Sequence, residues 1–216
     1  MPTSTAPSSR TRVRRMPERA QYDADAINSI VDSAFICSVA FQIDGVLHAI
    51  PTIHWREGNH LYIHGAKASR MFKALTEGEA CITIALADGL VLARSAMHHS
   101  VNYRSVVIYG RFELVTDPVE KQHRLQAFID GLYPGRWSTL RPVNEKELNA
   151  TSLLRIPLTE ASAKVRNWGV KDDEDDLGWP VWAGVIPLST VIGTPQTEKD
   201  SVVHTAPQTR FGPAGS

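Results

Sequence analysis

Hydrophobic and polar residues alternate along several short stretches of this chain, which is typical of strands that bury one face. The alternation is clearest over 36–43 and recurs over 46–55, 60–64, 81–87, 90–96, 104–115, 153–157, 161–168 and 181–188. Asp44-Gly45 and Asp88-Gly89 each predict a tight hairpin turn, joining 36–43 to 46–55 and 81–87 to 90–96. Pro51 predicts that its strand lies at a sheet edge or contains a bulge.

Apolar residues spaced three or four apart predict a small number of helices between these strands. The expected helices begin after Asp23 or Asp25 and run through Ser33, then cover 69–75, 118–131 and 145–149. So many short strands with so few helices argue against a doubly wound α/β sheet. The pattern predicts a mainly β fold, an antiparallel β-barrel with a few surface helices.

The length of 216 residues fits one domain with its own core. We expect a disordered N-terminal tail over 1–10, a folded domain over 11–192 and a flexible C-terminal tail over 193–216. Cys37 and Cys81 lie in apolar strands and are expected to be core thiols rather than a disulfide.

The charge balance and the hydropathy of the sequence argue against nucleic acid and membranes as partners. Lys and Arg total 23, equal to Asp and Glu at 23, so no overall field favours nucleic acid or an anionic membrane. No apolar run is long enough for a transmembrane helix, and the N-terminus lacks the apolar region of a secretory signal. We therefore expect a cytoplasmic protein. The acidic run 172–176 is interpreted as a solvated segment, although it could also shield a groove.

The junction near residue 69 is a candidate phosphate site. The strand 60–64 ends at Gly65, and Ser69 and Arg70 open a helix whose first N–H groups can bind an anion. The Arg70 guanidinium and the Lys67 ammonium add positive charge. The same residues fit a simpler alternative, in which Ser69 caps the helix and Arg70 points into water.

Histidines and polar residues mark two further candidate regions. His60, Tyr62 and His64 share one strand face and predict a wet pocket wall or an interface. No carboxylate or thiolate stands near them at ligand spacing, so we expect no metal site. The segment 98–105 is dense in hydrogen-bond donors and is interpreted as part of a binding site. The chain has no nucleophile elbow, P-loop or GxGxxG motif.

The order of several motifs resembles the FMN-binding split-barrel proteins related to pyridoxamine 5′-phosphate oxidase, and within them the nitroimidazole-reductase-like branch. The matching segments are 11–19, 50–52, 61–70, 88–95, 98–110, 163–166 and 181–188. The resemblance implies an antiparallel six-stranded split β-barrel. It also implies a homodimer with FMN in a groove between the subunits.

The resemblance also implies residue roles. Ser69 and Arg70 would hold the FMN phosphate, with Gly65 and Lys67 beside them. The segment Ile50-Pro51-Thr52 would run along the isoalloxazine ring, and His64 would stand near the ring as the candidate catalytic residue. The remaining predicted groove residues are His98, His99, Asn102 and Ser105.

Two departures from the family pattern narrow the function. Met71 replaces a second basic residue after Ser69-Arg70, and the C-terminal segment that binds pyridoxal phosphate has no counterpart. Oxidation of pyridoxine phosphate is therefore not expected. The hypothesis is an FMN-dependent oxidoreductase that passes electrons or hydride from NADH or NADPH to a small planar acceptor. The alternatives are a non-catalytic flavin carrier or sensor, and a heme-binding split-barrel protein that uses one of the histidines.

Overall fold

The computed structural model describes residues 5–210. The predicted tails over 1–10 and 193–216 lie partly outside this range. The strands are β1 (Ala20–Gln21), β2 (Ile36–Ile43), β3 (Val46–Ile53), β4 (Trp55–Glu57), β5 (His60–Ala66), β6 (Ala80–Leu92), β7 (Ser100–Gly110), β8 (Glu113–Leu114), β9 (Thr151–Pro157), β10 (Ala161–Arg166) and β11 (Gly184–Pro187). The α-helices are α1 (Ala24–Asp32), α2 (Arg70–Glu77), α3 (Pro118–Leu132) and α4 (Glu145–Ala150).

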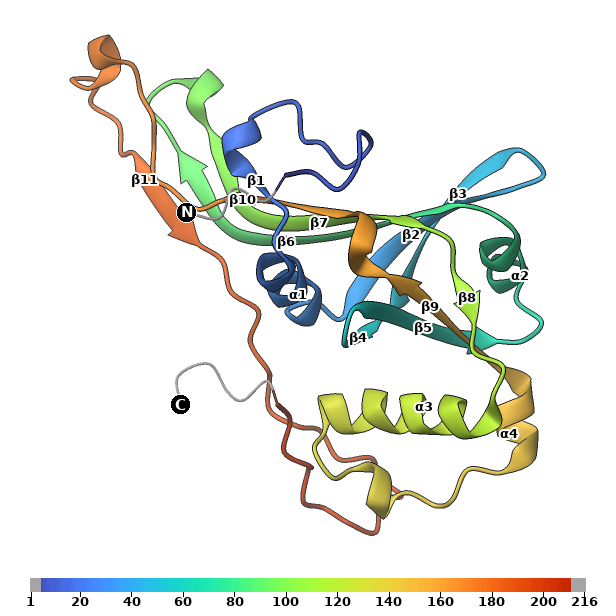
Figure 1. Ribbon diagram of the computed structural model, residues 1–216. Coiled ribbons are helices and arrows are strands. Elements are labelled where there is room, and N and C mark those ends of the chain that lie inside the picture. Colours follow the sequence, from blue (N-terminus) through green and yellow to red (C-terminus); the bar gives the residue numbers. More distant parts are fainter. Residues whose placement is uncertain (1–4, 211–216) are drawn as a thin grey trace.

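The strands form two antiparallel sheets, which confirms the prediction of a mainly β fold. Sheet A has the order β1-β10-β7-β6-β2-β3, and β11 also pairs with β6. Sheet B has the order β4-β5-β9-β8. Figure 1 shows α1 and α2 at opposite ends of the space between the sheets, with α3 across the outer face of sheet B.

The apolar core lies between the inner faces of the two sheets. Sheet A contributes residues such as Val39, Ile82 and Ile108, and sheet B contributes Leu61 and Ile156, all without exposed surface. Helices α1 and α2 add buried side chains at the two ends: Ile27, Ile30 and Val31 from α1, and Met71, Phe72 and Leu75 from α2. The alternation in the sequence therefore marks the core-facing side of strands such as β2 correctly, whereas β3 and β11 have no buried residue.

Local turn chemistry fixes the β2–β3 hairpin. Asp44 and Gly45 both have positive φ, of 51° and 79°, as a two-residue type I′ turn requires. All eight residues of β2 pair with β3, from Ile36 opposite Ile53 to Ile43 opposite Val46. The prediction of an edge strand is also confirmed, because β3 is the last strand of sheet A.

The hairpin predicted at Asp88-Gly89 is wrong. Strand β6 continues through both residues to Leu92, with an irregularity in its pairing to β7 between Ala87 and Gly89. A Cβ at Gly89 would lie 3.0 Å from Cγ1 of Val185 and 3.2 Å from the carbonyl oxygen of Ile186. Glycine is needed here because β11 packs closely, not because the chain turns.

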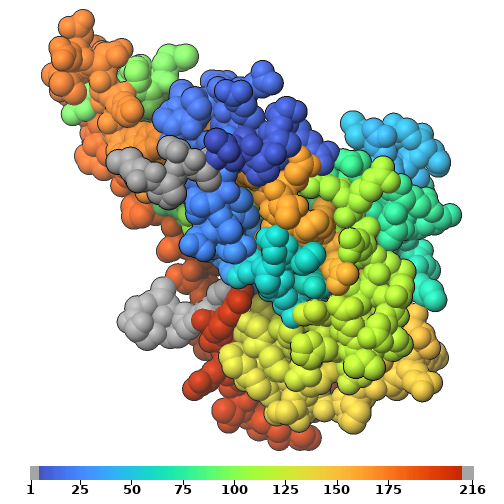
Figure 2. Space-filling model, viewed as in Figure 1, coloured from blue at the N-terminus to red at the C-terminus, as the bar shows by residue number. Residues whose placement is uncertain are grey.

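Both ends of the described chain contact the domain. Near the N-terminus, Arg10 forms ion pairs with Glu79 and Glu160. Near the C-terminus, Arg210 donates from its backbone to the carbonyl of Leu132 and from its side chain to that of Asp32. In Figure 2 the red C-terminal segment lies against the yellow residues that follow α3. Within residues 5–210, no helix combines the length and the apolar character needed to cross a membrane.

We expect Leu61→Ala to lower the free energy of unfolding by about 2–5 kcal/mol, because it removes a fully buried side chain between the sheets. Leu47→Ala is the matched control, since Leu47 is 74% exposed near the hairpin tip, and its effect should stay within about 0.5 kcal/mol. Urea unfolding at one pH measures both. Equal losses for the two variants would contradict this placement of the core.

Candidate functional site

The start of α2 presents an available hydroxyl group next to a positive charge. Ser69 is the N-cap residue of α2, but its side chain makes no capping hydrogen bond. Arg70 is exposed and forms no ion pair with any described residue. The geometry therefore argues against the alternative in which the Ser69 hydroxyl caps the helix, although Arg70 is exposed as that alternative expects. Both groups are available to an anion at the positive end of the helix.

Lys67 and Gly65, the other residues predicted for this corner, lie in different environments. Lys67 is exposed, and its charge contributes to the lowered pKa of Lys121, after the larger effect of burial. Gly65 is required by packing, because a Cβ there would lie 2.7 Å from the Phe72 ring. A surface pocket of about 400 Å³ separates Arg70 and Lys73 from the β2–β3 turn at Gln42–Asp44.

The predicted flavin-ring segment lies on the open edge of sheet A. Pro51 is exposed, Thr52 is partly exposed and Ile50 is 39% exposed. Only β2 pairs with β3 among the described strands, so the outer edge of β3 has main-chain groups available for a ligand. Strands β3 and β5 are in contact, which places this edge near the strand that leads to Ser69.

A pocket of about 590 Å³ lies beside the centre of β6. On this side of β6, β2 pairs with residues 81–83 and β11 with 89–92, so the residues between them have no paired strand among those described. The pocket is lined by Ile36, Ala85 and Leu188, and by the ion pair of Arg104 with Asp88 at 2.8 Å. Its size and mixed lining suit a small planar molecule.

His64 lies beneath α3 rather than in an open pocket wall, so the prediction of a wet face for His60, Tyr62 and His64 is wrong for the end of the strand. Its ring is 5.2 Å from Phe128 and 5.8 Å from Trp55, measured between centroids. Its Nδ1 is buried without a hydrogen-bond partner. Burial lowers the pKa of His64, so the ring is neutral near pH 7.

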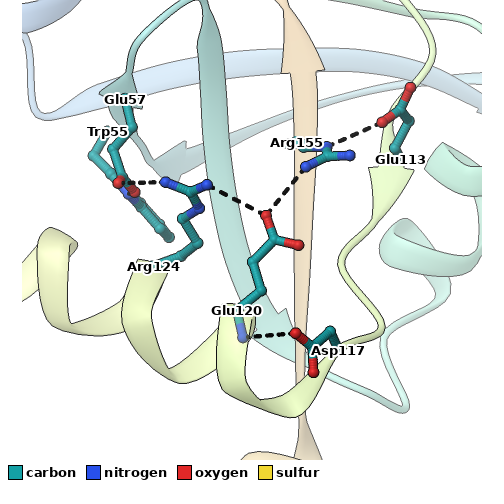
Figure 3. A network of polar contacts seen from close by, with 7 residues as sticks. All are labelled: Trp55, Glu57, Glu113, Asp117, Glu120, Arg124 and Arg155. Carbon is teal, nitrogen blue, oxygen red and sulfur yellow. Dashed lines mark hydrogen bonds and ion pairs between the residues drawn. The ribbon is translucent and has the colours of Figure 1, made fainter.

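Ion pairs attach α3 to sheet B (Figure 3). Arg124 contacts Glu57 at 2.9 Å and Glu120 at 3.4 Å, while Glu120 also contacts Arg155 at 3.2 Å. Trp55 donates from Nε1 to Glu57 at 3.0 Å. Phe128 is the buried side chain of α3. The cover over His64 is therefore held mainly by polar contacts, with one aromatic anchor.

His98, His99 and Asn102 lie at the other end of sheet A, whereas Ser105 pairs with Ala85 near the middle of β6. His98 is 3.4 Å from Asp173, and a ring nitrogen of His99 is 3.0 Å from the Ser95 carbonyl. Asn102 is buried and accepts a hydrogen bond from Arg166, whereas Ser105 donates to the Lys164 carbonyl at 3.3 Å. Asn102 therefore has a structural partner already.

One chain does not bring all predicted residues together. Pro51 pairs with Ser38, which pairs on its other side with Thr83 of β6. Ser100 pairs with Val91 of β6. At about 3.3 Å per strand residue, these two positions are roughly 25 Å apart along β6. Ile50, Pro51 and Thr52 thus lie far from His98, His99 and Asn102 along the sheet, while Arg70 lies across a pocket from the β2–β3 turn.

Sequence reasoning missed the residues whose role depends on tertiary contacts. Trp55 and Phe128 pack against His64 and Arg124 lies over the Tyr62 ring, although no local motif links these residues. Asp172, in the acidic run, has a side chain only 1% exposed and is 2.6 Å from Arg94, so this member is not solvated. Burial raises the pKa of the Cys37 thiol to about 12, and Cys37 and Cys81 are both free. Within residues 5–210 no three His, Cys, Asp or Glu side chains converge on a metal position.

The fold and the corner at Ser69 fit a known class of protein. The family model described as pyridoxamine 5′-phosphate oxidase matches residues 23–165. The chain therefore belongs to the pyridoxamine 5′-phosphate oxidase family, as its motifs indicate. A comparison with curated proteins found no match.

Three solved structures that are similar to this chain can be compared with it. The chain is 42% identical to the flavocytochrome Anf3 from Azotobacter vinelandii, with a TM-score of 0.90, over 94% of this chain and 95% of that one. It is 33% identical to an FAD and heme binding protein from Mycobacterium smegmatis, with a TM-score of 0.82, over 87% of this chain and 93% of that one. A putative 5-nitroimidazole antibiotic resistance protein from Bacteroides thetaiotaomicron shares the fold at 22% identity and a TM-score of 0.58, over 68% and 86%.

The buried, neutral ring of His64 makes the free energy of unfolding depend on pH. The folded pKa of His64 lies below its ordinary value, while the unfolded chain titrates near about 6.5. Below that pH the unfolded state binds a proton that the native state does not, so stability falls as pH falls. We expect the free energy of unfolding to decrease from pH 7.5 to 5.5, by up to about 1.4 kcal/mol per pH unit for this group.

The matched variants are His64→Phe, which should reduce this decrease, and His123→Gln, which should not, because His123 is exposed on α3. His54 is also buried with a lowered pKa and contributes with the same sign in every variant. Urea unfolding at both pH values, without added cofactor, measures the effect. An unchanged pH dependence in His64→Phe would show that its ring is protonated equally in both states.

Proposed function

We propose that this chain is a flavin-binding redox protein that also binds heme, and that it passes electrons or hydride from NADH or NADPH to a small acceptor. The observation that carries the proposal is the available Ser69–Arg70 corner in a chain 42% identical, over 94% of its length, to a flavocytochrome. A bound flavin would supply the redox chemistry, and the chain would supply binding, orientation and local charge.

The start of α2 supports phosphate binding. Ser69 offers a hydroxyl donor, Arg70 a planar fork, and the helix its first N–H groups. Met71 stands where the family pattern has a second basic residue after Arg70, and Lys67 supplies that second positive charge instead. The edge of β3 next to this corner offers main-chain donors and acceptors to the polar side of an isoalloxazine ring.

FMN is the flavin that the sequence resemblance implies, and one phosphate at Ser69–Arg70 is what FMN requires. The relative from Mycobacterium smegmatis is described as binding FAD instead. We retain FMN as the proposal for this corner. Mass spectrometry of the flavin released on denaturation distinguishes the two.

The separation of Ile50–Thr52 from His98 and His99 supports a homodimer. A flavin ring held at Ile50–Thr52 cannot also contact His98 and His99 of the same chain, which lie roughly 25 Å away along β6. The open edge of β3 and the outer face of β6, with exposed Thr83, Ala85 and Ala87, give a second copy a flat surface to approach. The partner copy would then supply its His98 and His99 to the same groove.

His64 fits a heme ligand better than a proton donor. Its imidazole is neutral near pH 7, and its Nδ1 has no protein partner. A neutral ring coordinates iron readily, whereas a general acid must hold a proton at the working pH. Trp55 and Phe128 supply aromatic surface beside it. The neighbouring cavity is only about 40 Å³, so heme binding requires that α3, held mainly by ion pairs, move outward.

We expect Ser69→Ala combined with Arg70→Gln to weaken flavin binding by a factor of about 10–100, because each change removes a hydrogen bond to a charged phosphate. Lys199→Gln is the control for the lost charge, since Lys199 is exposed and remote in the C-terminal segment. Flavin fluorescence quenching gives the Kd. Unchanged affinity would exclude the corner as the phosphate site, and a colourless protein that takes up no flavin would refute the function itself.

We expect hemin titration to produce a Soret band that depends on His64. In His64→Ala the band should weaken or shift, because iron loses its nitrogen ligand, whereas His123→Ala should behave like the unmodified chain. An unaltered spectrum in His64→Ala would assign the iron ligand elsewhere. Stopped-flow reduction of the bound flavin by NADH and by NADPH tests turnover, and a flavin reduced only by dithionite would favour a carrier.

A further inference from the structure

Three cationic side chains surround Trp168, beyond the end of β10. The guanidinium carbons of Arg19 and Arg166 each lie 5.1 Å from the centroid of its ring, and the Lys171 ammonium lies 5.3 Å from it. Cations over an indole ring are stabilised by its electron-rich face. Three like charges around one ring nevertheless repel one another, and a bound anion would offset that repulsion.

Arg166 is the buried member of this cluster. Its side chain is 4% exposed and donates to Asn102 Oδ1, to the Trp168 carbonyl at 2.8 Å and to the Gly169 carbonyl at 3.1 Å. All three acceptors are neutral, so none cancels the charge. The Nε atoms of Arg166 and of Arg19 are both buried without a hydrogen-bond partner. Unpartnered donors on buried cations are costly, and an oxyanion would satisfy them.

The neighbouring carboxylates are directed elsewhere. Asp172 contacts Arg94 at 2.6 Å, and Asp173 contacts His98 at 3.4 Å. Glu18 reaches to 3.8 Å from the Arg19 Nε, but its side chain is 57% exposed. Among the described residues, three positive charges therefore face a single, largely solvated carboxylate.

We propose that Arg19, Arg166 and Lys171 form a binding site for a phosphate group, separate from the corner at Ser69. A phosphate carries up to two negative charges and accepts hydrogen bonds on three oxygens, which matches a cluster of two guanidinium groups and one ammonium. A single carboxylate would leave most of the positive charge uncompensated. Tyr103, which pairs with Arg166 between β7 and β10, places the site at the opposite end of sheet A from α2.

The phosphate can come from two sources with the same chemistry. It can belong to a dinucleotide, whose diphosphate reaches this cluster, or to a separate small phosphate compound. In either case the site provides a second anion contact that a mononucleotide flavin at Ser69 would not use.

The test is isothermal titration of the purified chain with inorganic pyrophosphate. We expect Arg19→Gln combined with Lys171→Gln to raise the Kd at least about tenfold, because two charge-assisted contacts are lost. Lys146→Gln combined with Lys199→Gln removes the same net charge at remote exposed positions and should leave the Kd unchanged. Arg166 is left intact because its donors also support the backbone at Trp168 and Gly169.

Two results would overturn the proposal: no measurable pyrophosphate binding by the unmodified chain, or equal affinity in the Arg19/Lys171 variant. The variant Ser69→Ala with Arg70→Gln should keep the Arg19-dependent binding, so failure of the proposed flavin corner is distinguishable from failure of this site. Parallel titrations with FMN and FAD identify the source. If the Arg19/Lys171 variant has a higher Kd for FAD but not for FMN, the phosphate belongs to a dinucleotide flavin. If its Kd is unchanged for both flavins, the phosphate belongs to a separate compound.

Discussion

The burial of apolar side chains between two antiparallel sheets is the constraint on which the rest of this structure depends. Each strand that contributes to the core uses one face for it, and α1 and α2 close the ends of the space between the sheets. Polar chemistry is therefore confined to strand edges, outer faces and helix ends. The β3 edge, the start of α2 and the cluster around Trp168 are all positions of this kind.

The attachment of α3 differs in character from the core. One buried aromatic residue, Phe128, and a chain of ion pairs through Glu57, Arg124, Glu120 and Arg155 hold the helix over sheet B. Partly exposed ion pairs contribute little stability compared with buried apolar surface. A helix held in this way can cover a neutral histidine and still yield to a large planar ligand, which links the energetics of α3 to the proposed role of His64.

Charge is distributed so that some clusters are neutralised within the chain and others are not. Arg94 and Arg104 have carboxylate partners in Asp172 and Asp88. Arg70 at the start of α2 and Arg166 beside Trp168 have none among the described residues. An unpaired buried cation is costly, so a bound anion beside Arg166 would lower the free energy, whereas the exposed Arg70 is simply available to bind one. The proposed flavin phosphate and the proposed second phosphate would bind at these two places.

The sequence by itself determined the elements whose cause is local: the alternation of β2, the Asp44-Gly45 turn and the start of α2 at Ser69. For the cap of α1 it offered Asp23 or Asp25, and the structure has Asp23. The same Asp-Gly pair at Asp88-Gly89 lies inside a continuous strand, because β11, nearly a hundred residues later, packs against Gly89. Likewise the face of His64 appeared wet, since nothing nearby in sequence reveals that Phe128 covers it. Turn and cap preferences depend on a few neighbouring residues, so they can be recognised directly in the sequence. Burial and charge compensation depend on segments that meet only after folding, so only the tertiary structure decided them.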